Sequence, residues 1–239
     1  MSLPLTLLFA AMTSAEAIVT ILNTAAATSP RRYAEAKAVV ERDAMAGMPV
    51  QQFIVGVRTQ DKALSKKFLD ASRPKISYLA AEKDSALAWY LLSMERNDLK
   101  LLRKAAAGGN VQALNALGAI ETQQALADKT LSSNEVEQVL CRSFGYFGQA
   151  VAKRDPNGFI NMGTCYLKGL GCRQDPALAF ECFKSAAELG HPEAMDYMSA
   201  SYEHGNGVPQ SDELSLYWMM RGRAARGDEA AAKWLRERK

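Results

Sequence analysis

The sequence predicts an all-α fold of repeated helix–turn–helix units, and three observations support this prediction. The 239 residues include only 16 Gly and 8 Pro, while Ala, Leu, Met, Glu, Lys and Arg are plentiful, a balance that favours helices. A pattern of 36 to 37 residues recurs in the C-terminal half. Each copy has apolar residues at three- and four-residue spacing, as on one helix face, and Gly residues where the helices would end.

The two clearest units span residues 157–190 and 191–227. Five residues of the first unit recur 36 positions later in the second: Met162, Tyr166, Gly169, Gly171 and Gln174. After a one-residue insertion, Asp175 falls on Asp212, and the Gly residues that end the two units coincide. A fixed period of this length indicates a stack of structural repeats.

Each unit is expected to hold two helices joined by a Gly-containing loop. In the first unit the sequence predicts a helix over 157–167, a loop over 169–174, and a second helix capped by Asp175 with Pro176 at its first position. The second helix carries an apolar stripe: Ala179, Phe180, Phe183, Ala186 and Ala187. Gly190 is placed to end this helix.

The same frame continues upstream with less regularity. Further unit ends fall at three positions: Gly47, Gly109 and Arg154. The unit between the last two is nine residues longer than the next one, and it ends on Arg instead of Gly. The segment 86–90, with Trp89 and Tyr90, looks like the second helix of another degenerate unit, which would include residues 84–95. We therefore expect an N-terminal helical region of degenerate repeats over 1–97, and regular repeats with a C-terminal capping helix over 98–239, together forming one continuous solenoid.

Several residues with potential chemistry receive structural roles in this frame. The segment Tyr217–Met220 lies on a predicted second helix, so these side chains are expected to fill the space between adjacent units, with an exposed hydrophobic docking surface as the alternative. His191 falls in a turn between units, and His204 ends a helix, where a cation would favour the dipole. The paired Gly residues of the 169–171 and 205–207 segments recur at the repeat period between helices, so we interpret them as structural loops and not as phosphate cradles.

The C-terminal half resembles the Sel-1-like repeat (SLR) family, whose tetratricopeptide-related α/α unit has about 36 residues. The resemblance rests on Asn161–Asp175, Ala179, Ala186–Ala187 and Gly190–His191, and in the next unit on Met198–Tyr202, Gly205–Val208, Asp212, Ala224 and Gly227–Asp228. It implies a right-handed α/α superhelix with an extended concave face. Because SLR proteins often serve as adaptors in assembly and signalling, it also implies a role in binding other proteins.

The residue inventory argues against several kinds of catalytic site. With His191 and His204 as the only histidines, neither an H-E-x-x-H pair nor a three-His zinc site can form, and no metal is expected. The four cysteines include no C-x-x-C pair. We expect free thiols, with disulfides inside the 165–182 hairpin as the competing possibility. No Walker loop, G-x-S-x-G elbow or dinucleotide-binding motif occurs, so neither a cofactor nor a catalytic residue is expected.

The charge distribution is mild except at the C-terminus. The formal net charge is +3, which is too small to predict nucleic-acid binding. From Arg221 to Lys239, seven basic residues stand against three acidic ones. A solvated last helix with cations near its C-terminal end explains this patch, and docking of an anionic partner such as a nucleic acid or a membrane surface is the alternative.

The N-terminus leaves the compartment open. Leu3–Met12 is apolar and Ala15–Ala17 resembles a signal-peptidase site, yet no Lys or Arg precedes the apolar stretch. We expect a packed first helix here and no transmembrane segment, because no apolar run approaches about eighteen residues. The cysteine pattern favours the cytoplasm, and a periplasmic or secreted location remains possible.

The sequence thus favours a non-catalytic scaffold or adaptor that binds a peptide or a partner domain on its concave face. The predicted contact residues are the non-apolar positions of the first helix in three successive units: Gln112, Asn115, Asn161, Thr164, Lys168, Tyr197, Ser201 and Glu203. The alternative is a small-molecule binder or a hydrolase-like enzyme that uses a pocket in the irregular N-terminal half.

Overall fold

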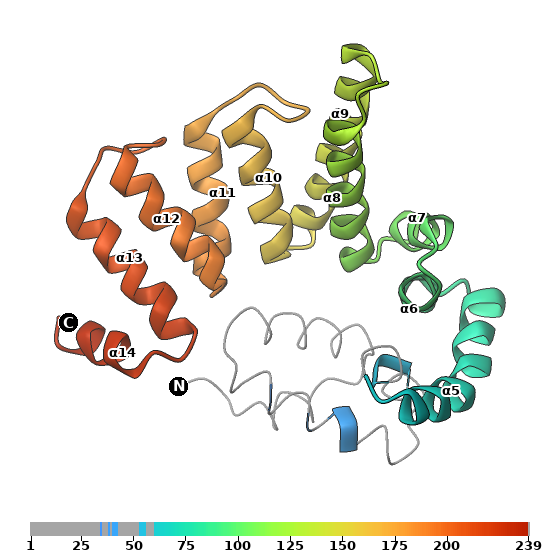
Figure 1. The fold of residues 1–239 in the computed structure, drawn as a ribbon. Coiled ribbons are helices and arrows are strands. Elements are labelled where there is room, and N and C mark those ends of the chain that lie inside the picture. Colours follow the sequence, from blue (N-terminus) through green and yellow to red (C-terminus); the bar gives the residue numbers. More distant parts are fainter. Residues whose placement is uncertain (1–33, 35–37, 39, 43–52, 56–59, 239) are drawn as a thin grey trace. The chain divides into compact units, whose positions relative to one another are not determined.

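The computed structural model describes residues 34, 38, 40–42, 53–55 and 60–238. The regular elements in these ranges are all helices (Figure 1), which confirms the predicted all-α fold. The chain divides into two compact units, one formed mainly by Pro30–Ala113 and the other mainly by Leu114–Lys239. The expected helix over 3–12 and the unit end near Gly47 lie outside the described residues.

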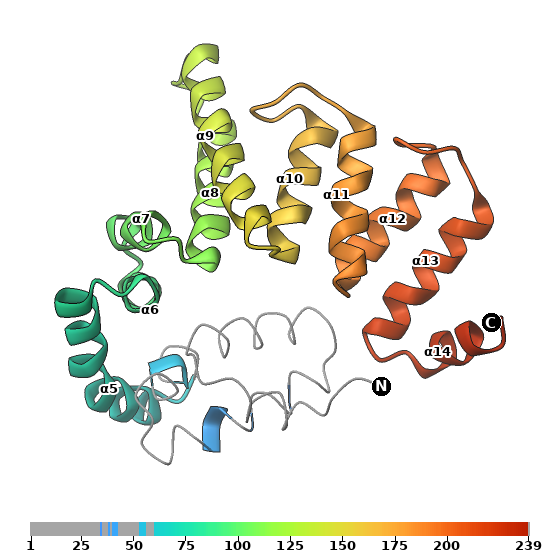
Figure 2. The ribbon, with the colours of Figure 1, turned by 180° about the vertical axis from the view of Figure 1, so that it is seen from behind.

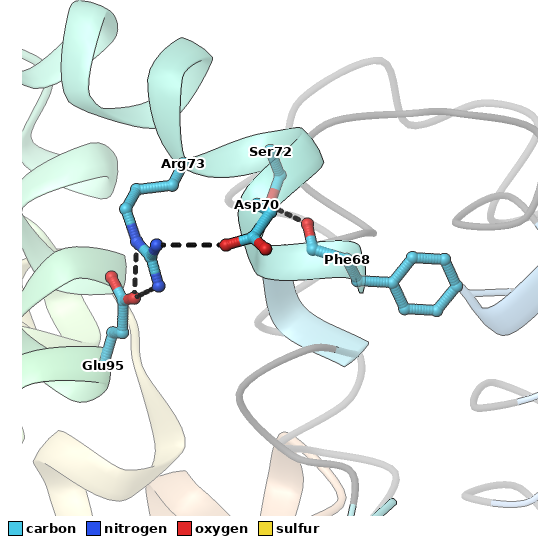
Figure 3. A network of polar contacts seen from close by, with 5 residues as sticks. All are labelled: Phe68, Asp70, Ser72, Arg73 and Glu95. Atoms are coloured by element: carbon cyan, nitrogen blue, oxygen red, sulfur yellow. Dashed lines mark hydrogen bonds and ion pairs between the residues drawn. The ribbon is translucent and has the colours of Figure 1, made fainter. Parts of the chain in front are cut away.

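Helices α5 (Lys62–Lys83), α6 (Ala86–Arg96) and α7 (Leu99–Ala107) belong to the first unit. Pro74 lies inside α5, where it cannot donate a backbone hydrogen bond and so bends the helix, and both ribbon views show α5 turning sharply (Figures 1 and 2). Arg73, at the bend, donates through Nε to Glu95 Oε1 of α6 at 2.8 Å (Figure 3). This partly buried ion pair ties α5 to α6.

Helices α6 and α7 form a hairpin with a connection of only two residues. Asn97 takes a left-handed conformation, with φ of 50°, and Asp98 caps α7 by accepting from the N–H of Lys100 at 2.8 Å. The two helices lie so close that a Cβ at Gly108 would come within 2.7 Å of Ala86 Cβ. The expectation that residues 86–90 belong to a second helix was wrong, because α6 is the first helix of a hairpin whose second helix is α7.

The second unit consists of paired helices followed by a short one. The pairs are α8 (Val111–Ala127) with α9 (Ser133–Ala152), α10 (Pro156–Lys168) with α11 (Pro176–Glu188), and α12 (Pro192–His204) with α13 (Asp212–Ala225), followed by α14 (Glu229–Arg236). From α9 to α13 the helices follow one another side by side in chain order (Figures 1 and 2). The helices of the second unit therefore stack as a solenoid.

The residues at the expected unit ends, Gly109, Arg154, Gly190 and Gly227, share a left-handed backbone conformation. Each of these residues has a positive φ, between 57° and 97°, and each stands directly before the N-cap of the next helix. The nine extra residues of the 110–154 unit lie in its helices, since α8 and α9 have 17 and 20 residues where the next pair has 13 each. Longer helices and a shorter connection thus replace the G-x-G loop of later units.

Successive repeats contact each other through a pair of aromatic rings, and this pair recurs 36 residues later. The ring of Phe144 meets Tyr166 edge-on at 5.3 Å, and Phe180 meets Tyr202 in the same way at 5.5 Å. A Cβ at Gly171 would lie 2.2 Å from the carbonyl oxygen of Leu140. A Cβ at Gly207 would lie 2.1 Å from the carbonyl oxygen of Pro176, which is 36 residues after Leu140. The Gly loops therefore pack directly against the backbone of the preceding repeat, as expected of structural loops.

Two details of the third pair differ from the sequence interpretation. The N-cap of α13 is Ser211, which accepts from the N–H of Leu214 at 3.3 Å, so the extra residue lies within α13 and Asp175 corresponds to Ser211 instead of Asp212. Within Tyr217–Met220, Tyr217 and Met219 are 39% and 40% exposed. The expectation that this segment fills the space between units was wrong for these two side chains, because α14 is too short to cover the helix. In the described ranges, no helix is long and apolar enough to cross a membrane.

Candidate partner-binding face

Three polar side chains form a continuous set of hydrogen bonds across the second unit, which we call the amide ladder (Asn115, Asp155 and Asn161). Asn115 Nδ2 donates to Asp155 Oδ2 at 2.7 Å, and Asn161 Nδ2 donates to Asn115 Oδ1 at 3.2 Å. Asp155 Oδ2 also accepts from the N–H of Gly158 at 2.8 Å and so caps α10. The ladder thus links the first helices of two repeats and fixes the orientation of both amides.

The ladder keeps hydrogen-bonding capacity for a ligand. Both Asn side chains are half-buried, and each amide has two N–H donors and a carbonyl acceptor. In the described part of the chain, the carbonyl oxygen of Asn161 accepts no hydrogen bond, and each amide uses one of its donors. Two oriented amides of this kind can pair with the N–H and C=O groups of a bound backbone.

An aromatic platform consists of the half-buried Tyr197 on α12 and the buried Phe183 behind it, which is only 1% exposed. The two rings stack with centroids 4.3 Å apart and planes inclined by 6°. Phe183 reaches this position because α10 has Gly163 where a Cβ would lie 2.7 Å from the ring atom Cε1. Tyr197 lies 36 residues after Asn161, and the N-caps of α12 and α10 are also 36 residues apart, so Tyr197 has on α12 the position that Asn161 has on α10. Tyr197 is half-buried and offers its remaining ring surface and its hydroxyl.

The other predicted contact residues do not join the ladder or the platform. Thr164 donates its hydroxyl to the carbonyl of Ile160 at 2.9 Å within its own helix, and Ser201 is only 6% exposed. Lys168 and Glu203 are exposed in the last turns of α10 and α12.

Gln112 is half-buried in the first turn of α8, in the first compact unit. Among the predicted residues, the structure brings Asn115 and Asn161 into direct contact, with Tyr197 nearby on the platform.

The helix N-termini beside the ladder carry charged groups and one buried histidine. His191 caps α12 without a side-chain hydrogen bond, is 3% exposed, and leaves Nδ1 and Nε2 unpartnered. Burial lowers the pKa of His191, the Asp155 carboxylate opposes this shift, and Arg226 adds to it. Arg226 is bound to Asp196 of α12 through both terminal nitrogens. His191 therefore lies between α11 and α12, where the sequence predicted a turn, and is a neutral buried side chain at pH 7.

Asp155 and the Arg226–Asp196 pair were not among the residues predicted from the sequence. Asp155 precedes Pro156 just as Asp175 precedes Pro176, so this recurring pair could have placed the start of α10 and its capping carboxylate. No sequence signal indicates the Arg226–Asp196 pair, because the two residues are 30 positions apart and meet only when α13 packs against α12.

The described residues include no group of three or more His, Cys, Asp or Glu side chains placed to hold a metal ion. All four cysteines are free. Burial raises the pKa of Cys165 to about 12 and that of Cys182 to about 11, so both thiols are protonated at neutral pH and are poor nucleophiles.

Comparisons with known proteins agree with the repeat pattern. The family model described as the Sel1 repeat matches residues 99–110, 160–191 and 192–221. A Sel1 repeat protein from Oxalobacter formigenes is 27% identical, with a TM-score of 0.46, over 53% of this chain and 90% of that one.

A protective antigen of uropathogenic Escherichia coli that displays an SLR fold is 19% identical, with a TM-score of 0.53, over 84% of this chain and 45% of its own length. The likeness to the antigen supports the fold. Sel1 repeats generally form non-enzymatic scaffolds that mediate protein–protein interaction. The matched segments contain hairpins and loops described above, and the chain therefore carries Sel1 repeats over these residues.

Proposed function

We propose that this chain is a non-catalytic scaffold that binds an extended segment of a partner protein across α8, α10 and α12. The observation that carries the proposal is the amide ladder, whose Asn115 and Asn161 side chains are held in place by hydrogen bonds at 2.7 and 3.2 Å. Side chains that are already ordered lose little conformational entropy on binding. Ladder amides can therefore contribute hydrogen bonds to a ligand at low entropic cost.

The chemistry of the surface suggests what the partner segment presents. The two amides suit the alternating N–H and C=O groups of an extended backbone, and the free ring surface of Tyr197, which is held by the buried Phe183, suits an apolar or aromatic side chain. Lys168 and Glu203, at the far ends of α10 and α12, would act on charged side chains of the same partner. Such charges at the rim of an interface affect specificity and association rate more than affinity.

The test is an affinity capture from a lysate of the source organism, followed by identification of the retained proteins and measurement of their binding. Replacing Asn161, Lys168 and Tyr197 together by Ala should weaken binding of the specific partner by about tenfold or more. The matched control is Asn206→Ala, which removes an exposed loop amide outside this surface. Equal binding by the triple variant, with unchanged helicity, would show that the partner uses another face.

A further inference from the structure

Helix α13 exposes an unusual amount of apolar surface. Nine large apolar side chains are exposed in the described part of the chain, and four of them lie within six consecutive residues of α13: Leu214, Leu216, Tyr217 and Met219, each 37–40% exposed. A helix with apolar residues all round is ordinarily covered on both sides. Because α12 and α14 together cover α13 only in part and leave these four side chains exposed, α13 has surface for a further partner.

The repeat geometry shows which contact is missing. In the two preceding pairs, Phe144 and Phe180 are covered by Tyr166 and Tyr202 of the following helix, and Leu216 is the next position in this series. Helix α14 has eight residues where α12 has 13, so it ends before the position that corresponds to Tyr202. The N-terminal half of α13 thus has the side chains of an inter-repeat surface, and Leu216 stays exposed.

The order of charges along α13 favours a second copy of the same helix as the occupant. One face of α13 carries an acidic, an aromatic and a basic residue in this order. They are Glu213, Tyr217 and Arg221, and their four-residue spacing places them on the same side of the helix. If two α13 helices lie antiparallel about a two-fold axis at Tyr217, Glu213 of each copy stands beside Arg221 of the other. The same arrangement pairs Leu214 of one copy with Met220 of the other. A self-complementary patch of this kind is what a two-fold dimer requires.

We propose that the protein forms an antiparallel homodimer through the α13 face (Glu213, Leu214, Tyr217, Met220 and Arg221), with Leu216 at the edge of this face. Arg221 already lies over the rings of Tyr217 and Trp218, at 5.8 and 4.7 Å, so its side chain is directed along this face before association. The dimer buries Leu216 and Tyr217 and leaves the amide ladder on α8 and α10 outside the contact.

The first test is the molar mass of the full chain by light scattering and sedimentation. The wild type should have twice the chain mass of 26.1 kDa and dissociate on dilution, whereas Tyr217→Glu should be monomeric with the same helical content. Leu126→Glu is the matched control, since Leu126 is 58% exposed on α8, and it should stay dimeric. A monomeric wild type at concentrations up to about 100 μM, or a dimer that persists in Tyr217→Glu, would overturn the proposal.

Charge reversal tests the antiparallel geometry. Glu213→Arg and Arg221→Glu should each weaken the dimer by about tenfold, because each brings like charges together. The double variant should recover most of the loss, since the reversed charges again face each other. Single variants that dimerise like the wild type, or a double variant weaker than both, would refute this arrangement. The measurements need no partner protein, so they stand apart from the test of the scaffold function.

Discussion

Replacing Arg154 by Gly should stabilise the protein, because Arg154 ends α9 in a conformation that suits glycine. Its φ is 57°, and the residues at the same position of the next two units are Gly190 and Gly227, with φ of 87° and 97°. The left-handed conformation costs a residue with a Cβ about 1–2 kcal/mol of folding free energy. Glycine avoids this cost but lowers stability by about 0.5–1 kcal/mol relative to other residues, because it has more conformational freedom in the unfolded chain. The net gain is then about 0.5–1 kcal/mol, since the exposed Arg154 side chain contributes little packing.

The reciprocal change, Gly190→Ala, should destabilise the protein by a similar amount. No atom lies within 4 Å of a Cβ built at Gly190, so the effect would come from the backbone alone. Urea unfolding followed by circular dichroism should give midpoints shifted in opposite directions for the two variants. Lys153→Gly is the control, because Lys153 has a φ of −91° and gains nothing from glycine. A midpoint for Arg154→Gly at or below that of the wild type would refute the reasoning.

Three further results are expected. Gly163→Ala should lower stability by about 1–3 kcal/mol through a clash with Phe183, whereas Gly148→Ala, with no atom within 4 Å of the added Cβ, should raise it by about 0.5–1 kcal/mol; parallel urea titrations compare the two. Because burial lowers the pKa of His191 below its ordinary value of 6.5, only the unfolded chain takes up this proton just below pH 6.5. Stability should therefore fall as the pH drops from about 6.5, and His191→Asn should flatten this slope in thermal melts. Finally, Cys165, with a pKa of about 12, should resist alkylation in the folded protein and react only after denaturation, as peptide mass spectrometry would show.

The sequence predicted the repeats well because each hairpin end has a strong local signal. The start of α11 depends on Asp175 and Pro176, and its end depends on Gly190. Such local signals predict where a helix begins and ends without knowledge of the tertiary packing. Residues 86–90 were misassigned because α6 connects to α7 through Asn97 in the left-handed conformation, without a Gly to mark the turn.

The candidate site could be predicted only in part. Helical spacing placed Asn115 and Asn161 on related faces, but spacing alone could not show that their amides bond to each other, because they are 46 residues apart. Ser201 was chosen for its polarity, yet it is buried. The exposure of Tyr217 depends on how far α14 extends, which is a property of the neighbouring helix and not of the Tyr217 segment itself.

The contacts of Gly171 and Gly207 have a consequence for how the second unit unfolds. Each loop rests against a helix carbonyl of the preceding repeat, so a repeat gains this contact from the neighbour before it. Opening the α12–α13 pair breaks the Gly207 contact alone, whereas opening the α10–α11 pair breaks both contacts. Local opening should therefore be easier in α12–α13 than in α10–α11, and hydrogen exchange should rank the two pairs in that order.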